Sequence, residues 1–463
     1  MMALLLLCVA VLFPGITVAA GNCVDQVAPY LSHVNTMGQH VVCVQTPWRA
    51  SGEQIPSEVV ASVFYDGLAG VEGHTYRLRT GDASNSVSAA VEQLLARLTA
   101  RRLGAEALGA DWLQANSHIS TALFDTAGHP VLEDNALYGQ SSVPAQNHVI
   151  FAFDGGRWLW PPIRIGHVWN ISLPSKQKLQ LRTLSLRPAV FSMEGFLSAE
   201  EAALIQQTAA PSLARSGVAN TDGSGKDSAD VRTSSNTFIS RGSSQEITEL
   251  ERRVHALTRT WYNEGEHIQV VKYTKHQMYE AHWDYFNPEQ YTNQPDVIER
   301  MDLWKRNRLA TVFWYLNTLP DGAGGETFFP RALDGHGESI TPWRYDYKSC
   351  NQGIKYPPTA GHALLFYSMR PDGQLEEHSM HGGVREASLF LFDMPQLRQA
   401  PSFPFLVSAA THATAYALLV KYLKPRPTCC SARCLRKDLR SGERTSGFGA
   451  RTSSQCSIHS SGS

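Results

Sequence analysis

The chain has 463 residues, of which 43% are hydrophobic and 18% are charged, and its formal net charge is -1. This length exceeds what one hydrophobic core usually serves, so we expect two folded domains with tails, and the composition is ordinary for a soluble globular protein. A net charge this close to zero excludes a whole-protein electrostatic attraction to nucleic acid or to an anionic membrane.

Residues 1–20 have the pattern of a secretory signal peptide. Residues 3–13 are an almost unbroken apolar run, and a Val-Ala-Ala sequence ends at residue 20. The run is too short for an ordinary membrane-spanning helix, although no Lys or Arg precedes it. A buried N-terminal helix or strand is the alternative. We expect a location in the endoplasmic reticulum lumen or elsewhere in the secretory pathway, where Asn170-Ile171-Ser172 becomes a candidate glycan acceptor.

Seven cysteines remain after Cys8 is lost with the signal peptide. Their number is odd and their spacing is wide, which is not the pattern of a disulfide scaffold. Cys23 and Cys43 form the most natural local bridge. The cysteines near residue 430 have no second Cys or His pair at zinc-site spacing, so we do not expect zinc there.

Residues 21–187 are predicted to form an α+β accessory domain of unknown role. Short strand-like runs at 41–44 and 148–153 flank one amphipathic helix, whose apolar residues recur at helical spacing over 87–98. No catalytic constellation is evident in this part of the sequence.

Residues 188–400 are predicted to form the second domain. Ser198 and Glu201 make a capping box that starts a helix, and a second helix follows Ser244. One stripe of the second helix holds apolar residues at 247, 250, 254, 257 and 261. Strand-like runs follow at 268–273, 310–316, 363–367 and 388–392. Helices that lead into many short strands indicate helices packed on a β-sandwich or barrel.

Residues 401–463 are predicted to be a low-complexity, disordered tail. Its last 40 residues are rich in Ser, Arg, Gly and Cys without periodicity. Residues 403–423 are moderately apolar but contain His412 and Lys421, so contact with a membrane through this segment is only weakly supported.

The feature that carries chemistry is the sequence His282-Trp283-Asp284. Side chains at positions i and i+2 of a strand lie on one face, so this imidazole and this carboxylate can bind one ion. His381, which follows a predicted strand and turn and precedes two glycines, is the best third ligand. Two histidines and one carboxylate leave half of the coordination sphere open, as a non-haem Fe(II) oxygenase requires.

Taken alone, a His-x-Asp sequence is a weak signal, because a surface strand with two solvated polar residues gives the same pattern. The context is more specific. The stretch 273–286, the turn Gly-Gly-Glu-Thr-Phe-Phe-Pro at 324–330, the strand 363–368 and His-Gly-Gly at 381–383 occur in one order. Together with Arg232-Thr233-Ser234 and the residues after them, they resemble the catalytic domain of the prolyl 4-hydroxylases, over residues 184–383.

This resemblance implies a double-stranded β-helix (jelly-roll) core with flanking helices, and so an α+β fold overall. It implies a procollagen-proline 4-dioxygenase-like activity that hydroxylates peptidyl proline with Fe(II), 2-oxoglutarate and ascorbate. It makes His282, Asp284 and His381 the iron ligands, and places Tyr273 and Thr311 at the 2-oxoglutarate pocket. Its peptide-facing positions match Arg232, Ser234, Tyr285 and Arg308, while packing or solvated surface polarity is the alternative for each.

The chain departs from the family after residue 383. The family has a lysine about ten residues past the second iron-binding histidine, where this chain has Leu391. Neither Arg385 nor Arg398 is at that strand position, so either could substitute only if the backbone took a different course. The cysteine that would pair with Cys350 is replaced by Val384. A dicarboxylate in a partly dry pocket needs a cation, so we expect weakened 2-oxoglutarate binding.

Three functions therefore stay open. The first is an active hydroxylase of a proline-containing peptide or protein in the endoplasmic reticulum. The second is a catalytically impaired peptide-binding module of the same fold. The third is a 2-oxoglutarate oxygenase that acts on another residue or on a small molecule. The sequence predicts no oligomeric state.

Overall fold

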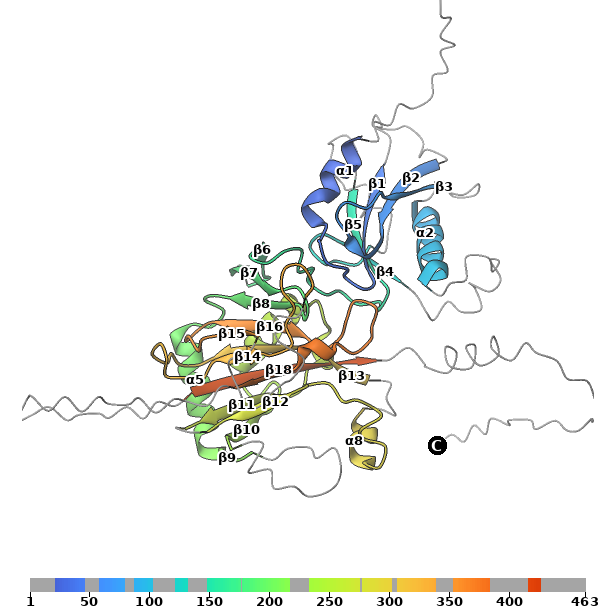
Figure 1. Ribbon diagram of the computed structural model, residues 1–463. Helices are drawn as coiled ribbons and strands as arrows, with labels where there is room; N and C mark the ends of the chain where they lie inside the picture. The colour runs from blue at the N-terminus through green and yellow to red at the C-terminus, as the bar shows by residue number, and fades with distance from the viewer. Residues whose placement is uncertain are drawn as a thin grey trace, which may run out of the picture. The chain divides into compact units, whose positions relative to one another are not determined.

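The computed structural model describes residues 21–45, 58–79, 87–102, 121–131, 148–175, 177–216, 233–274, 277–301, 306–338, 353–383 and 415–425. Within these residues the strands form three sheets (Figure 1). No helix among them is long and apolar enough to cross a membrane.

The first sheet has five antiparallel strands and belongs to the predicted accessory domain. Its order is β3 (His74–Arg79), β2 (Glu58–Phe64), β1 (Gln39–Gln45), β5 (His148–Phe153) and β4 (Ala122–Asp125). Leu94 and Leu98 of α2 (Val87–Arg102) pack on one face of this sheet against Val42 and Val44. The predicted Cys23–Cys43 disulfide is confirmed, and it joins α1 (Gly21–Val27) to β1.

The second sheet has nine strands and contains the strands predicted at 268–273, 310–316 and 363–367. Its order is β6 (Val168–Ser172), β7 (Lys178–Ser185), β8 (Val190–Met193), β16 (Ala363–Tyr367), β13 (Arg306–Tyr315), β18 (Ala415–Pro425), β11 (Ile268–Tyr273), β10 (Ser235–Ile239) and β9 (Ala214–Arg215). Figure 1 shows β18 as the red strand among them.

Both predicted helices of the second domain pack on this sheet. Ser198 caps α5 (Ala199–Ala209) in the predicted capping box, and Ser244 caps α7 (Gln245–Thr258). Ile205 of α5 and Leu250 of α7 join Val312 of β13 in one buried cluster. Trp261 was expected on the buried stripe of α7, but it is 73% exposed, because the helix ends at Thr258 and Arg259 takes a left-handed conformation.

The third sheet has four strands and lies against the second. Its order is β12 (Tyr279–His282), β17 (His381–Gly383), β14 (Thr327–Phe329) and β15 (Ile354–Tyr356). Phe329 of β14 packs against Phe366 of β16, with ring centroids 5.1 Å apart, and both belong to a buried cluster with Tyr315 of β13. Two antiparallel sheets face to face with helices outside are the layers of a double-stranded β-helix, so the predicted fold class is confirmed.

The limits of the nine-stranded sheet differ from the predicted domain limits. β6 and β7 precede residue 188, so the predicted boundary falls inside this sheet, and residues 21–425 form one compact unit.

The prediction of a disordered tail from residue 401 is wrong for 415–425, which form β18 between β11 and β13. Tertiary pairing with two strands overrides the weak local signal there. The predicted signal peptide, the strand at 388–392 and residues 426–463 lie outside the described residues.

Candidate metal centre

His282, Asp284 and His381 come together at one end of the four-stranded sheet. β12 and β17 are antiparallel, and His282 is the direct register partner of His381. Asp284 had been expected on the same strand as His282, but β12 ends at His282 and Asp284 follows it. The Nε2 atoms of His282 and His381 lie 3.8 and 3.6 Å from carboxylate oxygens of Asp284. The structure therefore brings the three predicted ligands to one point.

The spacing of these atoms fits a metal ion. One ligand atom from each residue lies within 4.8 Å of the other two. Two atoms that bind one ion at about 2.1 Å each are at most about 4.2 Å apart. The three ligand atoms would therefore need to move only slightly closer together to bind one ion. Two imidazoles and one carboxylate form the open donor set that suits non-haem Fe(II).

Backbone carbonyl groups orient both imidazoles. Nδ1 of His282 lies 2.9 Å from the Glu280 carbonyl oxygen, and Nδ1 of His381 lies 2.9 Å from the Ser379 carbonyl oxygen. Each Nδ1–H donates to its carbonyl, which fixes the tautomer and turns Nε2 toward Asp284. This pattern is the usual arrangement around metal-binding histidines and was not evident in the sequence.

Asp284 is 2% exposed and is held by two residues of β13. Thr311 donates its hydroxyl to Oδ2 of Asp284 at 2.7 Å. Arg308 donates Nη1–H to the backbone carbonyl of Asp284 at 3.1 Å. Thr311, which was predicted at the 2-oxoglutarate pocket, thus directly supports a metal ligand.

Arg308 was predicted to face a peptide, but its guanidinium forms a two-pronged ion pair with Glu266, at 2.7 and 3.0 Å. The guanidinium also stacks over Phe286, 4.8 Å from the ring centroid. Burial opposes the charge, but Glu266 more than offsets this effect and raises the pKa of Arg308. Because its donors are directed to Glu266 and Asp284, Arg308 braces the segment that carries the metal ligand.

The other predicted pocket and peptide residues have different surroundings. Tyr273 ends β11, and its hydroxyl lies 4.0 Å from where a Cβ on Gly383 would be, so it points toward β17. Ser234 is fully buried, and its hydroxyl lies 3.0 Å from that of Ser216, which argues against a peptide contact. Arg232 lies outside the described residues.

Tyr285 and Trp283 form an aromatic surface beside the triad. Their ring centroids are 5.9 Å apart, and Tyr285 is half-buried, which raises its pKa. Arg331 lies over the Trp283 ring, 5.0 Å from its centroid. Arg331 was not among the residues predicted from the sequence, although it directly follows the Gly-Gly-Glu-Thr-Phe-Phe-Pro turn.

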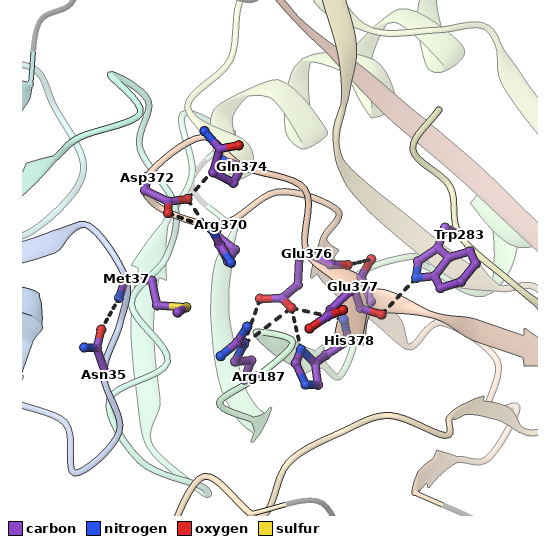
Figure 2. Close-up of polar contacts among 11 residues, drawn as sticks. Asn35, Met37, Arg187, Trp283, Arg370, Asp372, Gln374, Glu376, Glu377 and His378 are labelled. Carbon is purple, nitrogen blue, oxygen red and sulfur yellow. Dashed lines mark hydrogen bonds and ion pairs between the residues drawn. The ribbon is translucent and has the colours of Figure 1, made fainter. Parts of the chain in front are cut away.

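A second network of hydrogen bonds and ion pairs, which was not predicted from the sequence, supports the turn before His381 (Figure 2). Glu376 is buried, lies 2.8 Å from Nδ1 of His378 and pairs with Arg187 at 3.4 Å. Burial alone would raise the pKa of Glu376, but the His378 hydrogen bonds and the Arg187 charge lower it. Trp283 donates its indole N–H to the Glu377 carbonyl at 2.9 Å. This bond links the segment of His282 and Asp284 to the segment of His381.

Residues 384–400, with Val384, Arg385, Leu391 and Arg398, lie outside the described residues, as does Cys350. The structure therefore shows the triad but not the strand position where the family carries its lysine.

Comparisons with known proteins agree with this geometry. A profile of the 2OG-Fe(II) oxygenase superfamily matches residues 268–387. Probable prolyl 4-hydroxylase 10 of Arabidopsis thaliana is 35% identical over 210 residues, which cover 45% of this chain and 68% of that protein. The chain belongs to the prolyl 4-hydroxylase family.

A second curated relative is similar to the chain over nearly the same number of residues. Probable prolyl 4-hydroxylase 3 of Arabidopsis thaliana is 38% identical over 202 residues, covering 43% of this chain and 65% of that protein. The chain thus spans about two thirds of the length of these family members. The solved viral collagen prolyl hydroxylase of Paramecium Bursaria Chlorella virus-1 is 18% identical and covers 51% of this chain and 96% of its own, with a TM-score of 0.32. That score is too low to support a structural conclusion.

Proposed function

We propose that the chain uses Fe(II) and 2-oxoglutarate to hydroxylate peptidyl proline to 4-hydroxyproline. The observation that carries this proposal is the convergence of His282, Asp284 and His381, with both Nε2 atoms beside the Asp284 carboxylate. The curated relatives that the chain matches are named prolyl 4-hydroxylases, which favours proline as the target.

The three ligands would hold Fe(II) and leave its remaining positions for 2-oxoglutarate and O₂. Bound there, iron and 2-oxoglutarate supply the oxidising power for C–H hydroxylation. The chain itself orients the ligands through the Glu280 and Ser379 carbonyl groups and holds Asp284 with Thr311. Tyr273, whose hydroxyl points toward β17, is suited to bind the co-substrate.

A proline-containing peptide is the proposed substrate. Trp283 and Tyr285 offer aromatic faces next to the metal ligands, and a proline ring packs well on such faces. Arg331 adds a cation at the same place. We place this reaction in the endoplasmic reticulum lumen with ascorbate as reductant. The Cys23–Cys43 disulfide and the exposed Asn170 on β6 suit an oxidising compartment.

A catalytically impaired peptide-binding module is the second candidate. It is favoured by Leu391, which stands where the family has the lysine that binds 2-oxoglutarate. Such a module would keep the aromatic surface but bind the co-substrate poorly.

Succinate formation by the purified full-length chain tests these candidates. We expect succinate release that requires both Fe(II) and a proline-containing peptide, and hydroxyproline in the recovered peptide by mass spectrometry. Peptide binding without succinate release would support the impaired module. Succinate release that no proline peptide stimulates would point to a different substrate. Asp284→Leu is the control that removes the metal ligand.

A further inference from the structure

The described residues contain a partly open cavity of about 40 Å³ that the proposed reaction does not use. Residues of the segments 32–39, 159–162, 186–189 and 367–376 line it. One ordered water needs about 10–15 Å³. The cavity therefore has room for a small organic group as well as for water.

The walls of this cavity are largely apolar. Trp160 and Met369 are buried and form part of them. Met37 lines another side, and Figure 2 shows its side chain extended toward Arg187 and Glu376. Apolar walls with a few polar groups are typical of sites that bind small molecules.

Arg187 is the polar group of the lining whose hydrogen-bonding capacity is least used. Glu376 makes its short contacts with His378, at 2.8 Å to Nδ1 and 3.0 Å to the backbone N–H. Arg187 reaches the Glu376 carboxylate only through Nε, at 3.4 and 3.5 Å. Within the described residues, no hydrogen bond uses Nη1 or Nη2 of Arg187, although its side chain is only 20% exposed. The planar fork of an arginine matches a carboxylate.

The other charged groups of the lining have closer partners. Arg370 contacts the carboxylate of Asp372 through Nε at 3.2 Å and through Nη2 at 2.8 Å. Glu376 is the one carboxylate among the described residues that line the cavity, and His378 holds it most closely. Arg187 is therefore the group that is best placed to bind an anion here.

Two buried polar groups of the lining also have unused capacity. Gln39 is 1% exposed, and its Oε1 has no hydrogen-bond partner within the described residues. A half-turn of this amide would present its NH₂ group to an acceptor instead. The Tyr367 hydroxyl accepts a hydrogen bond from the Trp160 backbone N–H at 3.0 Å, and burial raises its pKa, so it keeps its own proton. Both groups are suited to donate to a ligand that Arg187 binds.

We propose that this cavity binds a small aliphatic monocarboxylate, whose carboxylate pairs with the Nη1 and Nη2 groups of Arg187. Its short apolar chain packs on Trp160 and Met369, and the buried amide of Gln39 bonds to the same ligand. The small volume favours a free acid over a peptide. The inference does not rest on the proposed hydroxylation, because binding in this cavity requires neither 2-oxoglutarate nor a proline substrate.

The cavity is connected to the metal centre through Glu376. The backbone carbonyl of Glu376 accepts a hydrogen bond from Ser379 Oγ at 2.7 Å, and the Ser379 carbonyl orients the His381 imidazole. A carboxylate that draws the Arg187 guanidinium into the cavity weakens its contact with Glu376. Occupancy should therefore change the environment of a metal ion that His381 binds.

The test measures propionate binding to the full-length chain by calorimetric titration. Arg187→Met keeps most of the aliphatic stem and should raise the Kd about ten- to hundredfold, the usual effect of losing hydrogen bonds to a charged group. Propionamide has the same shape without the charge and should bind at least tenfold more weakly than propionate. Arg157→Met is the matched control, because Arg157 is 25% exposed, pairs with Glu264 at 2.6 Å and does not line the cavity. Failure of the wild type to bind propionate, or an equal Kd for Arg187→Met, would overturn the inference.

Two further arms locate the bound carboxylate. Asp284→Leu removes a metal ligand and should leave the propionate Kd unchanged, whereas loss of binding would place the ligand on the metal and overturn the inference. A short peptide ending in alanine carries the same carboxylate on a longer chain and should bind more weakly than propionate. Tighter binding of the peptide would overturn the assignment to a free acid.

The connection to the metal centre has its own measurement. Propionate should change the absorption spectrum of the Co(II)-loaded wild type and leave that of Co(II)-loaded Arg187→Met unchanged. A change of equal size in both proteins would show that propionate acts on the metal directly, and no change in the wild type would overturn the connection through Glu376.

A labelling experiment on the wild type covers the case in which Arg187→Met does not fold. An arginine-specific dicarbonyl reagent is applied with and without propionate, and each arginine is followed by mass spectrometry. We expect propionate to protect Arg187 and to leave Arg157 unprotected. Equal labelling of Arg187 under both conditions would contradict the proposed site.

Discussion

Thr311 donates its hydroxyl to Oδ2 of Asp284 over 2.7 Å, and both residues are buried. A strand of the nine-stranded sheet thereby supports a metal ligand that follows a strand of the four-stranded sheet. The bond has a direct consequence for metal affinity.

Replacing Thr311 with Val keeps the shape of the side chain but removes the donor. We expect the affinity for Fe(II), or for Co(II) as a spectroscopic substitute, to fall about tenfold, as for other residues that orient metal ligands. Equilibrium metal titration of the purified chain measures this. Thr311→Ser keeps the hydroxyl and should restore most of the affinity. A Val variant with wild-type affinity would show that the bond does not position Asp284.

Glu376 positions the turn that carries His381 (Figure 2). Glu376→Gln weakens the contacts to Arg187 and His378, so the Ser379 carbonyl should hold the His381 imidazole less firmly. We expect weaker Co(II) binding, by up to about tenfold, and a changed Co(II) absorption spectrum. Glu377→Gln is the control, because that side chain is exposed and the substitution keeps the carbonyl that Trp283 uses. An unchanged Glu376→Gln spectrum would remove Glu376 from the network.

The Arg308–Glu266 ion pair should contribute to stability as well as to the site. The pair is partly buried, with side chains 16% and 24% exposed. Removing one partner by Arg308→Met should lower the free energy of unfolding by about 2–3 kcal/mol, between the values for exposed and fully buried pairs. Denaturant unfolding measures this. Arg308→Lys should recover little, because lysine cannot form the two-pronged contact. Full recovery by lysine would mean that charge alone matters.

His255 on α7 should make stability depend on pH. Burial, with a further contribution from the charge of Arg241, lowers the pKa of His255 from 6.5 to about 4. The unfolded chain therefore binds a proton between pH 6.5 and 4 that the folded chain does not, so His255 lowers stability as the pH falls through this window. Unfolding measured at pH 7 and pH 4.5 should show a smaller difference for His255→Asn than for the wild type. The exposed His336→Asn control should keep the wild-type difference.

The amino-acid sequence by itself determined the triad, the capping residues of α5 and α7 and the course of β11 and β16. These features depend on local signals: side-chain alternation along a strand, capping geometry and motifs within a few residues of one another. The family also followed from the order of such motifs.

Only the tertiary structure decided how Arg308 and Thr311 act and where β18 lies. Arg308 was read as facing a peptide, but its donors meet Glu266, 42 residues earlier in the chain. The place of β18 is set by its register with β13, and register depends on pairing between strands more than 90 residues apart. Local composition at 415–425 carries too little information to predict such a pairing, because the neighbouring strands supply the hydrogen bonds that make this segment a strand.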